Sequence, residues 1–301
     1  MRWRVIRVGA VVVLSLVVFV GLVSSVRAQE TTYQQSDPKI TYLGDWTTYA
    51  DPGASGGSFV LTGEIGAAAV VSFTGTEVAL IAKTGPTRGK AQVTLKDGSG
   101  AVVHEEIVDL YWPTYRQQQR VYEQTGLADA PHTLTITNLL EKNPASSHYR
   151  TTLDAVEILG TLTASSNRYE QDHGDLGYSG NWTSYSESGA SGGSYVLTGQ
   201  IDAAASVKFE GTGLAYLAKT GPTRGMARFE LKDGSNALVH EQTVDLYSPT
   251  YLQQRQVYHT GILPEDTYTL TITNLLDKNP ASSRYRATVD AFDVMGTLVS
   301  S

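Results

Sequence analysis

The sequence contains no cysteine among its 301 residues. Disulfide bridges, cysteine-ligated zinc and lipidation on cysteine are therefore excluded. Histidine is scarce as well, with six residues, and the HExxH pattern of zinc hydrolases does not occur. The chain must fold on hydrophobic packing and hydrogen bonding alone.

Positive charge is also in short supply, since 23 Lys and Arg side chains stand against 30 Asp and Glu, a net charge of −7. Residues 1–28 hold four of the arginines and no acid, so the chain from residue 29 onward carries −11. Nucleic acids and anionic membrane surfaces recruit proteins through Lys and Arg. We therefore expect no nucleic-acid partner and no membrane contact beyond the N-terminal segment.

A long apolar run, residues 8–26, follows three arginines and ends just before Ala28. This order predicts a signal peptide over residues 1–28, with Gln29 as the new N-terminus and secretion to the cell surface or beyond. The alternative is a retained membrane anchor, because 19 apolar residues approach the length of a membrane span. Export without cysteine favours a bacterial or archaeal source.

Helical periodicity is missing after residue 28. Short β-branched and aromatic runs alternate with polar residues instead, and turns rich in Gly, Pro, Asn and Asp separate them. The pattern predicts an all-β sandwich. Gly75-Thr76-Glu77 is expected to form a turn between two strands, and the polar residues 29–39 are expected to lie loosely outside the folded unit.

The chain consists of two tandem copies of one unit. The segment Lys83–Gly89, KTGPTRG, returns unchanged at 219–225, and pairing residues 33–163 with 169–299 needs no gap and gives 78 identities in 131 positions. We predict a first domain over 33–163, a linker over 164–168 and a second domain over 169–299. Such a short linker predicts a semi-rigid pair.

Several motifs recur in a fixed order in both copies. In the first copy they are LGDW at 43–46, GASGGS at 53–58, KDG at 96–98 and LDAVEI at 153–158. This series resembles the galactose-binding-like jelly-roll domains of secreted bacterial proteins, relatives in shape of carbohydrate-binding modules. The resemblance implies two tandem jelly-roll β-sandwich domains and a glycan ligand, although the same fold also hosts adhesive and structural proteins.

No catalytic set emerges from the sequence. His104-Glu105 and His240-Glu241 are the His–acid pairs that both copies keep, and neighbours in a strand point to opposite faces. KTGPTRG is not a phosphate-binding loop, because its glycines are wrongly spaced and a strand follows it. We therefore expect no enzyme and no catalytic residue.

The predicted ligand site is a tyrosine-rich loop around Pro113, together with the KTGPTRG loop. Tyrosine rings offer an apolar face and a polar edge, which suits sugar recognition. Trp112 is Ser248 in the second copy, so the two sites should differ in affinity. The predicted ligand residues are Tyr111, Tyr115, Gln117, Gln118, Lys83 and Arg88 in the first copy, and Tyr247, Tyr251, Gln253, Gln254, Lys219 and Arg224 in the second.

Two interpretations of KTGPTRG stay open. In one, the glycines and the proline shape a tight loop, and Lys83 and Arg88 are solvated or paired locally. In the other, these two cations donate hydrogen bonds to a sugar hydroxyl or to a uronate carboxylate. Identity between the copies decides little, because most positions are identical anyway.

We predict no cofactor. Asp154 and Asp290 precede the closing strand, where resembling domains can place an acid that is structural or that helps to hold calcium. One acid in each copy is too few for the six to eight oxygen ligands of calcium, so a structural calcium ion would need backbone help.

The leading hypothesis is a secreted, non-catalytic protein that binds cell-wall or extracellular polysaccharide through two repeated sites. Linking two weak sites raises the effective concentration at a repeating polymer. The alternative is a structural adhesin, matrix protein or filament subunit that binds surface proteins or itself.

Overall fold

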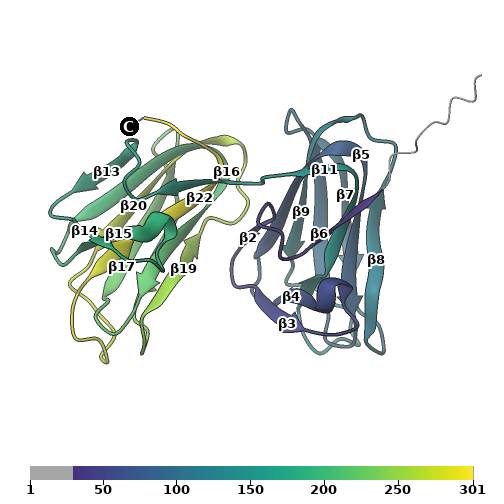
Figure 1. Cartoon of the computed structure of the whole chain (residues 1–301), viewed down its shortest axis with the longest axis horizontal. Coiled ribbons are helices and arrows are strands. Elements are labelled where there is room, and N and C mark those ends of the chain that lie inside the picture. Colours follow the sequence, from purple (N-terminus) through teal and green to yellow (C-terminus); the bar gives the residue numbers. More distant parts are fainter. Residues whose placement is uncertain (1–29, 301) are drawn as a thin grey trace, which may run out of the picture.

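The computed structural model describes residues 30–300. Within that range every regular element is a β-strand except two short 3₁₀ turns, and the strands form two β-sandwich domains that lie side by side (Figure 1). The predicted all-β pair of sandwiches is confirmed. The predicted signal peptide lies outside the described residues, and the predicted domain bounds stay predictions.

Domain 1 comprises strands β1 to β11. Its large sheet has the order β1-β11-β5-β9-β6-β7, with β2 and β8 also paired to β5, and its small sheet has the order β10-β4-β3. The elements are β1 (Thr31–Gln34), β2 (Thr41–Leu43), β3 (Thr47–Ala50), η1 (Ser55–Gly57), β4 (Ser58–Thr62), β5 (Ala68–Thr84), β6 (Lys90–Asp97), β7 (Val102–Asp109), β8 (Arg116–Gln124), β9 (Ala130–Asn138), β10 (Thr151–Leu153) and β11 (Ala155–Thr163).

Domain 2 comprises strands β12 to β22 and repeats this plan, with the orders β12-β22-β16-β20-β17-β18 and β14-β15-β21. The elements are β12 (Asn167–Glu170), β13 (Leu176–Ser179), β14 (Thr183–Ser186), η2 (Ser191–Gly193), β15 (Ser194–Thr198), β16 (Ala204–Thr220), β17 (Met226–Asp233), β18 (Leu238–Asp245), β19 (Leu252–His259), β20 (Asp266–Asn274), β21 (Ala287–Val289) and β22 (Ala291–Leu298).

One strand of 17 residues, β5, runs through the position where a turn was predicted. Its first half pairs with β9 and its second half with β8, while β11 pairs with parts of both halves and has a register shift beside Gly160. A β-carbon at Gly75 would lie 2.4 Å from the Leu159 carbonyl oxygen, and one at Gly160 would lie 2.1 Å from that of Thr74. Gly75 and Gly160 lie opposite each other and therefore permit a close approach of the paired strands β5 and β11, and the predicted turn at 75–77 is wrong.

The first strand also departs from expectation. Residues 31–34 pair with β11, and Tyr33 lies opposite Val156 at the edge of the large sheet. The Gln35 N–H then donates to the Asp154 carbonyl at 3.2 Å. The polar segment is therefore held by backbone pairing, which its composition does not reveal.

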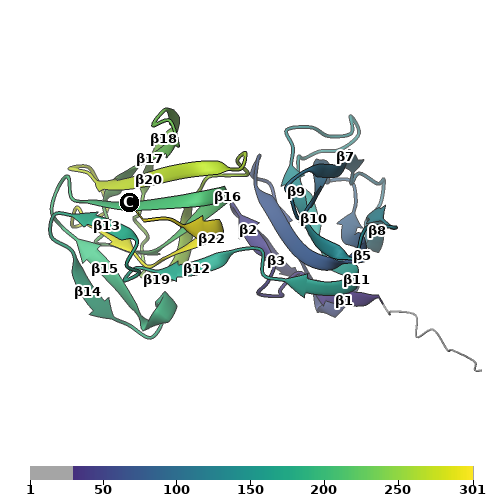
Figure 2. The same ribbon diagram turned by 90° about the horizontal axis from the view of Figure 1, so that it is seen from above.

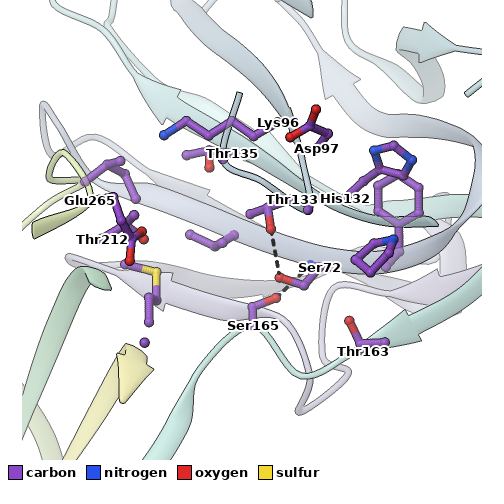
Figure 3. A pocket seen from close by; sticks show the side chains of 18 residues that line it. Ser72, Lys96, Asp97, His132, Thr133, Thr135, Thr163, Ser165, Thr212 and Glu265 are labelled. Atoms are coloured by element: carbon purple, nitrogen blue, oxygen red, sulfur yellow. Dashed lines mark hydrogen bonds between the residues drawn. The ribbon is translucent and has the colours of Figure 1, made fainter. Parts of the chain in front are cut away.

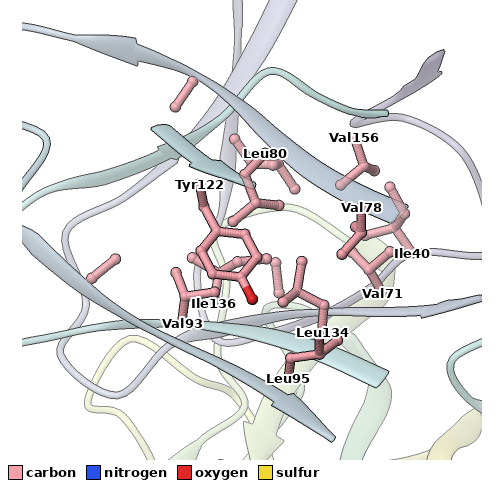
Figure 4. Packing of buried hydrophobic residues seen from close by; sticks show 14 of the residues in the cluster. Ile40, Val71, Val78, Leu80, Val93, Leu95, Tyr122, Leu134, Ile136 and Val156 are labelled. Carbon is pink, nitrogen blue, oxygen red and sulfur yellow. The ribbon is translucent and has the colours of Figure 1, made fainter. Parts of the chain in front are cut away.

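Between the two sheets of domain 1 lies a core of alternating side chains (Figure 4). Val93 and Leu95 of β6 and Leu134 and Ile136 of β9 are buried, while the residues between them are half-buried. Burying each such side chain contributes about 1.5–3 kcal/mol. Domain 2 fills the same space with larger rings, including Tyr216, whose hydroxyl donates to the Thr288 carbonyl.

Three loops meet at one end of each sandwich, called here the loop end: residues 85–89, 110–115 and 139–150 in domain 1. The Gly89 N–H donates to the Arg150 carbonyl at 2.8 Å, the Trp112 N–H to that of Gly85 at 3.3 Å and the Ser147 N–H to that of Pro86 at 3.1 Å. These backbone bonds tie the loops together and fix the positions of their side chains.

No helix in residues 30–300 is long and apolar enough to span a membrane.

Candidate ligand-binding site

The Tyr115 ring is the exposed centre of the loop end in domain 1. It lies directly on Gly85, where a β-carbon would come within 2.3 Å of the ring, and its hydroxyl is 3.2 Å from Thr87 Oγ1. About half of the residue, 52%, stays exposed. Tyr251 repeats the arrangement in domain 2, 50% exposed over Gly221. A ring held this firmly loses little freedom when a ligand stacks on it.

Lys83 and Arg88 lie beside this ring, with Lys83 Nζ 5.0 Å and Arg88 Cζ 5.5 Å from its centroid. Arg88 is only 3% exposed and donates to the Lys83 carbonyl at 3.3 Å and to Thr87 Oγ1 at 2.6 Å. Burial lowers the pKa of Arg88. Lys219 and Arg224 are buried in the same way beside Tyr251. Direct ligand binding by these cations stays a prediction; in the structure they support the ring.

Asp51 holds the lysine in place. Lys83 Nζ is 2.6 Å from Asp51 Oδ2, which also accepts from Gln117 Nε2 at 2.7 Å, while the Gly53 N–H donates to Oδ1 at 3.0 Å. The hydrogen bond from Lys83, with that from Gly53, lowers the pKa of Asp51. In domain 2, Glu187 takes this role towards Lys219 and Gln253.

Two further predicted residues are held away from this cluster. Gln118 adopts a left-handed backbone with φ of 48° and donates from Nε2 to the Gly53 carbonyl at 2.9 Å, as Gln254 does towards Gly189. Tyr111 is half-buried, and its N–H donates to Asp109 Oδ1 at 2.9 Å, as that of Tyr247 does towards Asp245. The structure thus gathers Tyr115, Lys83, Arg88 and Gln117, with Tyr111 and Gln118 at the margin.

Sequence reasoning missed three members of the site: Asp51, Phe59 and Tyr49. Phe59 lies 4.8 Å from Lys83 Nζ and stacks on Tyr49, which is 46% exposed. In domain 2 the equivalent pair is Tyr185 on Tyr195. The available signal was an acid 32 residues before the lysine in both copies, Asp once and Glu once.

Domain 1 alone has an additional aromatic surface next to Tyr115. The Arg116 guanidinium stacks 4.6 Å from the Trp112 ring, and Trp112 is 47% exposed. The corresponding residues of domain 2 are Ser248 and Leu252. The two loop ends therefore share the tyrosine and its support but differ in aromatic area and in charge.

Residues 30–300 contain no group of three or more His, Asp or Glu side chains that could hold a metal ion. Asp154 is fully buried, and neither of its oxygens makes a hydrogen bond of normal geometry within the described residues. Burial raises its pKa to about 6, which favours the neutral acid. With one carboxylate, this position of domain 1 does not fit a calcium site.

The repeated His–acid neighbours point to opposite sides of their strands. His104 Nδ1 lies 3.5 Å from the Tyr122 hydroxyl beneath the sheet, whereas the exposed Glu105 contacts Gln92. His240 likewise faces Tyr258. The side chains of each pair therefore do not converge on one site.

A cavity of about 400 Å³ lies between the two domains (Figure 3). Six of its 18 lining residues carry hydroxyl groups, and none of the predicted ligand residues lines it. Its labelled lining residues are Ser72, Lys96, Asp97, His132, Thr133, Thr135, Thr163, Ser165, Thr212 and Glu265.

No family model and no curated protein matches the chain. Among solved structures, a xanthan lyase from Paenibacillus is 15% identical with a TM-score of 0.34, over 90% of this chain and 26% of the lyase. An exo-β-1,3-galactanase from Phanerochaete chrysosporium is 13% identical with a TM-score of 0.28, over 88% and 67%. The ANXUR1 extracellular domain from Arabidopsis thaliana is 8% identical with a TM-score of 0.25, over 91% and 100%. The chain spans about a quarter of the lyase, and similarities this weak carry no argument about function.

Proposed function

We propose that the protein is secreted, lacks catalytic activity and binds cell-wall or extracellular polysaccharide through its two loop ends. The observation that carries the proposal is the half-exposed tyrosine, Tyr115 and again Tyr251, seated on a glycine and supported by a buried arginine and a lysine. A flat, pre-organised ring suits the apolar face of a sugar, and neighbouring side-chain amides suit its hydroxyl groups.

Duplication supports a polymeric ligand. Two sites on one chain convert the second contact with a polymer into an intramolecular event, which raises affinity without new contacts. The acidic chain has no matching advantage at nucleic acid or at an anionic membrane.

Affinity electrophoresis against a panel of neutral and acidic polysaccharides tests the proposal. We expect wild-type retardation on at least one polymer, about tenfold weaker binding for Tyr115→Ala or Tyr251→Ala, and loss of binding for the double variant. The matched control is Val102→Ala, which removes an exposed side chain away from the loop end and should leave binding unchanged. Binding that survives the double variant would reject the loop-end site, and an unretarded wild type on every polymer would reject the function.

A protein partner is the second candidate function. The edge strands β7 and β18 expose Val102, Val103 and Ile107, and Leu238 and Val239, beside unpaired backbone groups. Such an edge can accept a strand from another protein. Replacing Val103 and Val239 by lysine should abolish capture of a surface protein while leaving polysaccharide retardation unchanged.

A further inference from the structure

The two domains share a buried apolar contact. Leu43, Ala68 and Val70 of domain 1 pack with Ala215 and Met295 of domain 2 in one cluster, and Leu43 and Ala68 are fully buried. In both views β2 faces the second domain, and Figure 2 shows it next to β16 and β22 (Figures 1 and 2). This contact and the polar contacts around it are called the joint below.

Polar contacts border the apolar cluster. His259 Nε2 lies 2.9 Å from Glu64 Oε1, and Gln256 Nε2 donates to the Gly44 carbonyl at 3.1 Å. The Gly261 N–H donates to His259 Nδ1 at 3.1 Å, so Nδ1 is the acceptor and Nε2 carries the proton that it donates to Glu64. Glu64 is held from its other side by the Asp45 N–H.

The linker is fastened at the same place. The Ser165 N–H donates to the Lys39 carbonyl at 3.0 Å, and Ser165 Oγ accepts from the Ser72 N–H at 2.8 Å. Thr41 Oγ1 donates to Ser166 Oγ at 2.8 Å. The chain between the domains is therefore bound to domain 1 rather than free to swing.

The joint is head to tail, because each domain contributes a different face. Domain 1 uses β2 and the first half of β5, and domain 2 uses β16, β19 and β22. In Figure 1 the counterparts of these faces, at β13 and β8, lie at the two outer ends of the molecule. A contact of this kind does not close on itself, so free counterpart faces could add further chains end to end.

The copies differ in polarity or charge at five residues that form the joint, whereas Ala68 and Ala215 are alanine in both copies. Where domain 1 has the apolar Leu43 and Val70, the outer face of domain 2 has polar side chains, and where domain 2 has a neutral amide and imidazole, the outer face of domain 1 has charges. The pairs, joint residue first, are Leu43 and Ser179, Glu64 and Gln200, Val70 and Ser206, Gln256 and Arg120, and His259 and Glu123.

The outer face of domain 1 is also occupied by its own ion pairs. Arg120 contacts Glu30 at 3.0 Å, Glu123 at 2.7 Å and Glu157. On the outer face of domain 2, Ser179 and Gln200 are exposed. The outer face of domain 1 keeps Ala79 and Leu159 where the joint has Ala215 and Met295, but the outer face of domain 2 lacks Leu43 and Val70. Neither outer face offers the Glu–His pair that the joint uses.

We infer that the duplicated domains have diverged to form a single-use joint: the Leu43–Glu64–Val70 face fits domain 2 of the same chain, and the two outer faces are unable to repeat the contact. The molecule is then one semi-rigid body that does not polymerise through these faces. This conclusion does not depend on the proposed polysaccharide ligand.

Domain exchange between the copies tests the joint. Leu43→Ser, Glu64→Gln and Val70→Ser together install the residues that domain 2 carries at these positions. Spin labels on Ala101→Cys and Ala237→Cys, both exposed, report the distance between the domains, and the cysteine-free background leaves no other label site. We expect one narrow distance distribution for the otherwise unchanged chain and a broad one for the triple variant. The reciprocal exchange, Ser179→Leu, Gln200→Glu and Ser206→Val, should keep the narrow distribution.

If the triple variant fails to fold, a charge swap between Glu64 and His259 tests the joint instead. His259→Glu places two carboxylates in contact and should broaden the distribution, whereas His259→Glu with Glu64→His restores the pair and should narrow it again. A distribution unchanged by His259→Glu, or broad without any joint substitution, would overturn the inference. So would growth of the wild-type chain into end-to-end oligomers with concentration that Ser206→Lys abolishes.

Discussion

The loop end and the joint differ in how far the two copies have diverged. Residues 83–89 are identical in the two copies, and residues 142–150 differ only where His148 becomes Arg284. At the joint, Leu43, Glu64 and Val70 are all replaced. Under the proposed function the loop end would serve the same purpose in both copies, whereas the joint is formed once and three of its residues differ between the copies.

The support of the tyrosine shows what is kept when residues do change. Asp51 of domain 1 corresponds to Glu187 of domain 2. Each acid pairs with the lysine of its own domain and accepts a hydrogen bond from a glutamine, Gln117 or Gln253. Phe59 becomes Tyr195, and each ring still lies within 5 Å of the lysine Nζ. Charge and ring position are therefore preserved at the loop end, whereas polarity itself changes at the joint.

The largest expected effect comes from breaking the loop end at Gly89. A β-carbon there would lie 2.9 Å from Tyr149 Cα and 3.0 Å from the Glu141 carbonyl oxygen, both backbone atoms that cannot move separately. We expect Gly89→Ala to cost about 3 kcal/mol or more in the free energy of unfolding. Chemical denaturation measures it, with Gly174→Ala, which meets no atom within 4 Å, as the neutral control. Equal midpoints for the two variants would contradict the crowding.

The next largest effect is a pH dependence of stability that comes from the buried acids. Burial raises the pKa of Asp154 from 3.8 to about 6, so at pH 7 the fold holds a carboxylate that is less favourable inside than in the unfolded chain. Asp154 should therefore add to the free energy of unfolding as pH falls from 7 towards 4, by about 3 kcal/mol at most. Asp154→Asn should raise stability at pH 7 and remove this contribution, leaving that of Asp290.

Asp290 sharpens the comparison between the copies. Its pKa is also raised to about 6 by burial, but the Ser191 N–H donates to Asp290 Oδ1 at 2.9 Å. Asp290→Asn should therefore stabilise the chain less at pH 7 than Asp154→Asn does. A pH titration of the denaturation midpoint for both variants checks the order, and equal gains would show that the Ser191 hydrogen bond does not matter.

The third largest effect is expected from removing the lysine that supports the Tyr115 ring. Lys83→Met removes the cation from the half-buried Asp51, and we expect a loss of about 2 kcal/mol in the free energy of unfolding together with weaker polysaccharide binding. Asp51→Glu copies domain 2 and should stay within about 0.5 kcal/mol of wild type. If both substitutions cost the same, the lysine–acid pair is not what holds the ring.

The sequence allowed the all-β class, the duplication and the tyrosine-rich loop to be predicted, because alternation, repetition and turn residues are local signals. The 17-residue strand β5 was missed because Gly75 looks like a turn residue, and only its close pairing with Gly160 of β11 shows why a glycine stands within a strand there. The grouping of Tyr115 with Gln117 at the loop end follows from their nearness in sequence, but Asp51, which accepts from Gln117, lies 66 residues earlier and gave no local signal. Ligand binding by these residues stays a prediction. The joint could not be predicted from the sequence. Substitutions between the copies, such as Leu43 to Ser179, become informative only when the structure shows which face of each domain contacts the other.

The smallest expected effect tests the one place where the loop ends differ. Tyr251→Ala leaves only the site of domain 1 active, and Trp112→Ser in that background should weaken binding about fivefold, close to 1 kcal/mol. The Arg116 guanidinium held on Trp112 adds a positive charge at the site, so the loss should be larger for an acidic polysaccharide and should shrink at high salt. In the Tyr115→Ala background, Ser248→Trp with Leu252→Arg should transfer the same preference to domain 2. Affinity electrophoresis at two salt concentrations measures the loss in domain 1 and the gain in domain 2. An equal loss of affinity for neutral and acidic polymers would show that Trp112 contributes apolar area only and that Arg116 does not take part in binding.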